Sequence, residues 1–120
     1  MSDEIARIVT AQKEKNARAA ERRVRRLAEA RHEAARLAEE FVRVDRTVRR
    51  VVLFGSVATG RVRSERFDID LAVEADDYFS LLRAAELSSF RVDVVDLRSA
   101  STGFARRVLD RGVVLYGPER

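Results

Sequence analysis

Three aspartates and one Gly-Ser pair are the residues of this sequence whose types and spacing could do chemistry. Asp68 and Asp70 alternate with apolar residues in the stretch FDIDLAVE at 67–74. In an extended strand both carboxylates would therefore lie on one face. No lysine or arginine stands between them. Taken alone, this pattern is more typical of a half-buried strand with a solvated polar face than of a reaction centre.

A third carboxylate, Asp93, comes from the stretch FRVDVVDL at 90–97. If the apolar residues of both stretches pack in one layer, Asp93 shares a face with Asp68 and Asp70, whereas Asp96 lies on the opposite face. Three carboxylates that converge without basic partners repel one another, and a divalent cation removes that conflict. Oxygen ligands of this kind suit Mg²⁺ or Mn²⁺. The three aspartates therefore predict a metal site.

The Gly-Ser pair, Gly55-Ser56, follows the apolar run at 51–54, which is typical of a buried strand. Glycine lets the backbone approach a bulky anion, and amides at a helix start suit phosphate. Most such pairs are plain turns, but an Asp-x-Asp follows this one on the next expected strand. A phosphate-binding turn beside metal carboxylates is what a nucleoside triphosphate requires. Arg61 and Arg66 in the spacer would offset triphosphate charge, although a solvated loop explains them equally well.

Residues 2–44 contain no glycine or proline and are rich in Ala, Arg and Glu, which predicts one long helix capped at Ser2-Asp3. Forty residues at a rise of 1.5 Å make a rod of roughly 60 Å. Its apolar stripe is too long for the rest of the chain to cover. We therefore expect a homodimer, or contact with another protein, through residues 5–42.

From residue 50 onward, short apolar or alternating runs are separated by helical patterns, which predicts an α/β fold with a small sheet flanked by helices. We expect the long helix at 1–47 to precede one domain at 48–120. The expected strands are 51–55, 67–74, 90–97 and 113–117, and the expected helices are 76–89 and 99–112.

The net charge of +4 is uneven, since residues 1–50 hold 14 Lys/Arg against 9 Asp/Glu. A nucleic-acid binder would have to use this segment, but its arginines are not interleaved with aromatic residues, so we do not expect nucleic acid as a partner. The chain has no cysteine, no apolar signal region and no run long enough to span a membrane. These absences lead us to expect a cytoplasmic protein.

The stretches LFGSVATGRVRSERFDIDLAV and RVDVVDL together resemble the minimal nucleotidyltransferases of the polymerase β-like superfamily. The signature of that family is Gly-Ser, a spacer, Asp-x-Asp, and a third Asp on a later strand. The resemblance covers about residues 48–117. Two departures stand out: the spacer after Ser56 has 11 residues rather than the usual 10, and Phe67 replaces a usual Ser or Thr.

The resemblance implies transfer of a nucleoside monophosphate, AMP from ATP, to a hydroxyl group. It assigns the triphosphate to Gly55 and Ser56, and two Mg²⁺ ions to Asp68, Asp70 and Asp93. It also implies an antitoxin that adenylylates a tyrosine of an all-helical HEPN ribonuclease toxin. Three alternatives stay open: transfer to a small molecule such as an aminoglycoside, a decayed module that neutralises its partner by contact, and nucleic-acid binding through residues 1–50.

Overall fold

The computed structural model describes residues 2–119, which form a four-stranded mixed sheet with helices and a long N-terminal helix. The strand order is β3-β2-β1-β4, with β1 antiparallel to β2 and β4, and β2 parallel to β3. The predicted fold class is therefore confirmed. Along the chain the elements are α1 (Asp3–Val44), β1 (Arg50–Phe54), α2 (Gly55–Thr59), β2 (Ile69–Glu74), α3 (Tyr78–Glu86), β3 (Val92–Asp96), α4 (Thr102–Arg111) and β4 (Val113–Tyr116).

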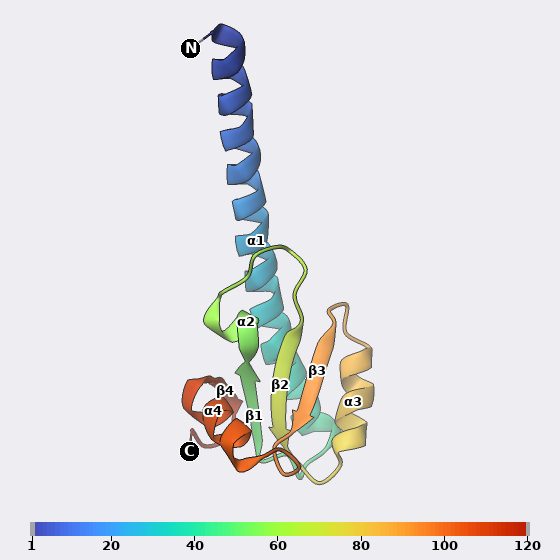
Figure 1. Cartoon of the computed structure of the whole chain (residues 1–120). Coiled ribbons are helices and arrows are strands. Elements are labelled where there is room, and N and C mark those ends of the chain that lie inside the picture. Colours follow the sequence, from blue (N-terminus) through green and yellow to red (C-terminus); the bar gives the residue numbers. More distant parts are fainter. Residues whose placement is uncertain (1, 120) are drawn as a thin grey trace.

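Helix α1 is far longer than the rest of the protein is wide (Figure 1). It begins at its N-cap Ser2, whose side chain accepts a hydrogen bond from the amide of Ile5. Residues 2–18 are all exposed, and the first buried residue of the helix is Ala30. The molecule consequently measures 66 × 29 × 19 Å. Within residues 2–119, not even this helix has an apolar stretch that could cross a membrane.

The main core lies between one face of the sheet and the helices α1 and α3. Small residues of α1, such as Ala34 and Ala38, let the helix approach the sheet closely, and Leu37 and Phe41 fill the space between them. Hydrophobic burial of this kind is the largest favourable contribution to folding. From the sheet the core receives Val51, Leu53, Ile69, Leu71, Val73 and Val94, and from α3 it receives Leu81 and Ala85.

A smaller core covers part of the opposite face of the sheet. Val52 and Ala72 pack there with Leu97 and with Val108 of α4. In Figure 1, α4 lies beside β4 and β1, and no helix crosses β2 and β3 on this side. The strand ends described below are therefore left open to solvent.

Strands β2 and β3 each begin two residues later than their patterns predicted. The ladder between them starts with a hydrogen bond from the amide of Ile69 to the carbonyl of Arg91. Phe67 still packs against the main core, which explains why the apolar alternation extends beyond the strand. The expected division of the chain after residue 47 stays a prediction, and residues of α1 share a core with the sheet.

Asp45, a buried carboxylate, holds the end of α1 against the start of α3. It accepts hydrogen bonds from the Thr47 hydroxyl (2.7 Å), the Thr47 amide (2.9 Å) and the Asp77 amide (3.0 Å). These bonds, led by that of the Thr47 hydroxyl, lower the pKa of Asp45. The carboxylate thereby sets the direction in which α1 leaves the sheet.

Phe41→Ala should lower the free energy of unfolding by about 3–4 kcal/mol, because a fully buried ring is removed from the main core. Ile8→Ala, in the projecting part of α1 where Ile8 is 62% exposed, should change it by less than about 0.5 kcal/mol. Urea denaturation at one protein concentration measures both. Equal effects of the two changes would show that α1 does not fold with the sheet.

Candidate active site

Three strand ends meet at one end of the sheet (Figure 1): the C-terminal end of β1 and the N-terminal ends of β2 and β3. Asp70 lies opposite Phe54 in the antiparallel pair and opposite Asp93 in the parallel pair. Residues paired in this way share a sheet face, so Asp70 and Asp93 lie side by side as their alternation predicted. Asp68 comes two residues earlier, just before the ladder begins.

Gly55 brings the turn after β1 directly against the carboxylate of Asp70. A Cβ atom at this position would lie 2.2 Å from Asp70 Oδ2, so any side chain here would force the Asp70 carboxylate to move. The φ of Gly55 is also +75°, in the left-handed region that favours glycine. Ser56 follows within the short helix α2. The Gly-Ser pair and the aspartates are therefore neighbours in space as well as in the predicted motif.

Asp70 is the carboxylate whose ionisation the site changes most. Burial, followed by the negative charges of Asp93 and Asp68, raises the pKa of Asp70 from 3.8 to about 6. The charges of both neighbours act on Asp70, so the three carboxylates form one electrostatic group. Their mutual repulsion is the physical signature of a site that a cation would stabilise.

The three carboxylates differ in their access to solvent. Asp93 is exposed, Asp70 is half-buried, and the Asp68 side chain is 40% exposed with Arg91 Nε 4.0 Å away. Among residues 2–119, no three acidic or histidine side chains are already drawn together as a metal site. The donor set fits Mg²⁺ in chemistry, because it offers only carboxylate oxygens and an accessible face. The metal and catalytic roles of these residues stay predictions.

After α2, residues 60–66 of the spacer form a largely exposed loop that passes over α1 (Figure 1). Glu65 of this loop forms a 3.2 Å ion pair with Arg22 of α1. Arg66 lies beside Asp68 in the lining of a hollow, whereas Arg61 does not line it. Of the two predicted spacer arginines, the structure therefore brings Arg66 close to the carboxylates.

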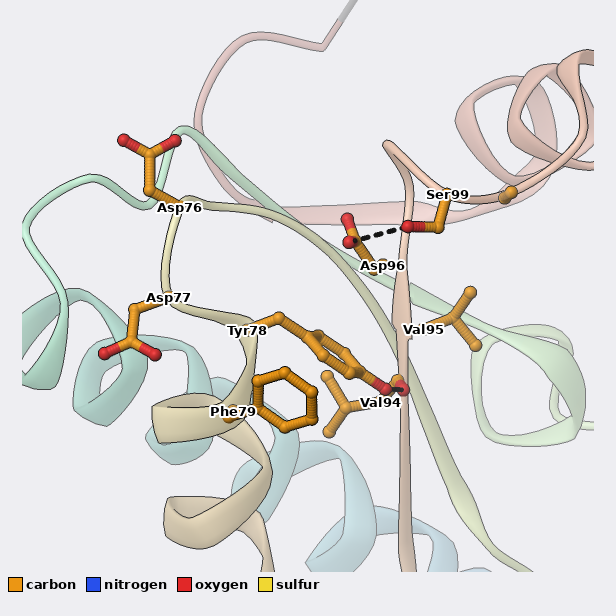
Figure 2. Close-up of a pocket in the computed structure, with 9 residues that line it drawn as sticks. Asp76, Asp77, Tyr78, Phe79, Val94, Val95, Asp96 and Ser99 are labelled. Atoms are coloured by element: carbon orange, nitrogen blue, oxygen red, sulfur yellow. Dashed lines mark hydrogen bonds between the residues drawn. The ribbon is translucent and has the colours of Figure 1, made fainter.

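The other acidic side chain of β3, Asp96, belongs to a separate hollow at the opposite end of the strand. Asp96 is paired in register with Val73 and so faces away from Asp93, as predicted. Figure 2 shows this hollow of about 630 Å³, where Ser99 donates a hydrogen bond to Asp96 and the Tyr78 hydroxyl donates one to the carbonyl of Val94. The hollow does not include the Gly-Ser pair or the three aspartates.

Two contacts of α1 were missed at the level of sequence. Arg31 interrupts the apolar stripe of α1, and its guanidinium donates to the carbonyls of Val57 (3.0 Å) and Ala58 (3.4 Å) in α2. Arg26 stacks on the ring of Phe90, 3.8 Å from its centroid. Charged residues within a helical stripe were the available signal, but their partners lie more than 25 residues away in the chain, beyond the reach of helical periodicity.

The fold is that of a nucleotidyltransferase family. The family described as polymerase beta, nucleotidyltransferase matches residues 37–120, well over half of the chain, and the protein belongs to that family. The match begins inside α1, so it includes the buried end of the helix and excludes the projecting part.

Its relatives include an adenylyltransferase and solved toxin–antitoxin complexes. Protein adenylyltransferase MntA of Shewanella oneidensis is 36% identical over 77 residues, which is 58% of this chain and 55% of that protein. A crystal structure of a toxin–antitoxin with AMP-PNP superimposes with a TM-score of 0.57 at 32% identity, covering 70% of this chain and 73% of the other. A tri-AMPylated Shewanella oneidensis HEPN toxin in complex with MNT antitoxin matches with a TM-score of 0.50 at 29% identity, covering 72% and 74%. The chain thus spans about half the length of the curated relative.

Asp70→Asn should stabilise the protein at pH 8 by about 1 kcal/mol. Two pKa units correspond to roughly 3 kcal/mol, which we reduce because the carboxyl is only half-buried. The folded-state pKa lies above the unfolded value, so the folded state binds the proton more tightly and stability falls as pH rises from 3.8 to about 6. The gain should therefore be absent at pH 4.

Thermal unfolding between pH 4 and pH 8 measures this difference. Glu14→Gln, on the exposed part of α1, removes one negative charge elsewhere and should give no comparable gain. A loss of stability in Asp70→Asn at pH 8 would contradict the proposed repulsion among the three carboxylates.

Proposed function

We propose that this protein transfers AMP from ATP to a hydroxyl group of a HEPN toxin and so acts as its antitoxin. The observation that carries this proposal is the convergence of Gly55, Asp70 and Asp93 at one open edge of the sheet. Membership of the nucleotidyltransferase family and the similarity to protein adenylyltransferase MntA support the reaction class. The structures similar to this chain contain a nucleotide analogue in one case and an AMPylated HEPN toxin in another.

Asp68, Asp70 and Asp93 are the residues that would hold Mg²⁺. The raised pKa of Asp70 supports this assignment, because burial and the charges of Asp93 and Asp68 disfavour its ionised form, which a bound cation would stabilise. Bound Mg²⁺ supplies positive charge where negative charge develops on the attacking and leaving oxygens. Two ions are the number that the family resemblance implies.

The chain's own residues bind the donor and accept the proton. Gly55 and Ser56 hold the triphosphate of ATP at the end of β1. The accepting hydroxyl oxygen attacks the α-phosphorus, the bond from that phosphorus to the oxygen bridging to the β-phosphate breaks, and pyrophosphate leaves. Asp93 takes the hydroxyl proton, because it is the exposed carboxylate of the group and the single histidine, His32, lies on α1. The product is a phosphodiester between AMP and the acceptor.

Asp93→Asn should abolish AMP transfer, with a loss of at least about 100-fold, because it removes both a metal ligand and the proton acceptor. Asp96→Asn is the matched control, since it neutralises a carboxylate on the opposite face of the same strand. Transfer is measured with ATP labelled at the α-phosphate, Mg²⁺ and a purified HEPN protein, and AMP-PNP binding is titrated with and without Mg²⁺.

The two readings of the site give different results in these measurements. An active transferase binds AMP-PNP only with Mg²⁺ and loses turnover in Asp93→Asn but not in Asp96→Asn. A decayed module that neutralises its partner by contact would bind a HEPN protein without any nucleotide binding. That second result would contradict the proposed reaction.

We also propose that the projecting part of α1 pairs with a second copy of the chain. Ile5, Ile8 and Val24 are 51%, 62% and 68% exposed, and among the described residues of the helix none before Ala30 is buried. Apolar residues repeated along one helix are typical of a helix–helix interface. The same stripe is the feature that led us to expect pairing through residues 5–42.

Replacing Ile5 and Ile8 together by glutamate should convert the dimer to a monomer, because two charges would lie in the apolar stripe. Sedimentation velocity at micromolar concentrations gives the assembly state of the wild type and the variant. A matched control replaces Glu4 and Arg7 by glutamine and should leave the dimer intact. A monomeric wild type would contradict the proposed pairing.

A further inference from the structure

Arg31 of α1 reaches across to α2, the short helix that begins with the Gly-Ser pair. Its Nε donates a hydrogen bond to the carbonyl of Val57 at 3.0 Å, and its Nη2 donates one to the carbonyl of Ala58 at 3.4 Å. Across residues 2–119, this guanidinium forms no ion pair with a carboxylate. Its charge is therefore directed at the end of a helix and not at an acidic side chain.

The two carbonyls need a partner because α2 ends after one turn. In a longer helix they would accept hydrogen bonds from the amides at positions 61 and 62. The amide of Arg61 instead bonds to the Thr59 hydroxyl at 3.3 Å. The amide of Val62 bonds to the carbonyl of Gly60 at 3.1 Å. The last carbonyls of a helix carry partial negative charge, which the guanidinium stabilises.

The contact between Arg31 and α2 is closely packed on both sides. A Cβ atom at Gly60 would lie 3.3 Å from Arg31 Nη2, tighter than an ordinary contact. Gly60 also has a φ of +78°, in the left-handed region that favours glycine at the end of a helix. On α1, the neighbouring residues Ala30 and Ala34 are fully buried in the main core. The guanidinium therefore extends from a part of α1 that the core fixes in place.

The N-terminal end of α2 has no free space in which to move. A Cβ atom at Gly55 would lie 2.2 Å from Asp70 Oδ2. The N-cap residue, Phe54, provides no side-chain hydrogen bond to the helix, and Val57 is the one buried residue among the five of α2. A rotation of α2 about Val57 would therefore move Gly55 relative to Asp70. The bonds from Arg31 at the other end of α2 oppose that rotation.

We propose that Arg31 is a positioning residue for the nucleotide: by holding the C-terminal end of α2, it keeps Gly55 and Ser56 in the arrangement that receives the triphosphate. The proposal rests on the proposed function, which assigns the triphosphate to these two residues. Arg31 precedes the region matched by the nucleotidyltransferase family, residues 37–120. The long helix thus adds to the shared domain a residue on which the affinity for the nucleotide depends.

The first test follows the amide of Gly60, which closes α2 through a 2.8 Å hydrogen bond to the carbonyl of Ser56. Hydrogen exchange of the full chain is measured by NMR without nucleotide or Mg²⁺. Arg31→Met removes both bonds to α2 and should speed exchange at Gly60 about tenfold. The amide of Arg49, bonded to the carbonyl of Glu74 at 2.8 Å at the other end of the sheet, is the internal reference. Its exchange should change less than about twofold, because the loosening is local.

The second test is titration with AMP-PNP and Mg²⁺, which connects the loosening of α2 to the nucleotide. If about one-tenth of the molecules keep the binding arrangement, the apparent dissociation constant rises about tenfold, and we expect this for Arg31→Met. Arg31→Lys keeps the charge and can donate to one carbonyl, so it should recover part of the affinity. Arg25→Met replaces another exposed arginine of α1 and is the matched control, which should bind like the wild type.

Four results would overturn the role of Arg31. They are unchanged exchange at Gly60 in Arg31→Met, equal acceleration at Gly60 and Arg49, unchanged affinity for AMP-PNP, and an equal loss of affinity in Arg25→Met. Equal acceleration would show that Arg31 only stabilises the fold as a whole. A wild type that does not bind AMP-PNP would overturn the proposed function together with this role. Local loosening with a loss of affinity that Arg31→Lys partly restores would support the proposal.

Discussion

The repulsion among three carboxylates at one sheet edge is the constraint around which this structure is arranged. Asp70 bears most of it, since it is half-buried and has Asp68 and Asp93 as charged neighbours. A folded chain that keeps a carboxyl with a pKa of about 6 gives up stability at neutral pH. Sites of this kind are where function and stability conflict. The fold holds the arrangement because the strands that carry it are fixed by the core behind them.

The scaffold resolves the conflict by placing opposite environments on the two sides of the same strands. Behind β2, Ile69, Leu71 and Val73 are fully buried against α1 and α3. On the other side, the small core under α4 covers Val52 of β1 and Ala72 of β2, and no helix crosses the ends of β2 and β3 that carry the carboxylates (Figure 1). Gly55 completes this end of the sheet, because a side chain there would displace the Asp70 carboxylate. A ligand of positive charge can therefore approach Asp70 without disturbing the core.

Helix α1 connects these features over its whole length. Its C-terminal part supplies Leu37 and Phe41 to the core, and Asp45 after it fixes the start of α3. The middle part contacts the loop through Arg22, Phe90 through Arg26 and α2 through Arg31. The remaining N-terminal part is exposed at every residue from 2 to 18. One continuous element thus reaches from the core, past the site, to the exposed stretch at residues 2–18.

The sequence alone predicted the long helix and the succession of strands and helices after it. It also singled out Gly55-Ser56 and the three aspartates as one motif. Both predictions were possible because alternation and motif spacing are local properties of a chain. Only the tertiary structure decided the pairing of Asp70 with Asp93, the contact of Gly55 with Asp70 and the arginines around Asp68. These depend on strand register and on contacts such as Arg22 with Glu65, which are 43 positions apart in the sequence. The hydrophobic periodicity of a single helix or strand cannot predict contacts between residues so far apart in the sequence, because these contacts form only when packing brings separate segments together.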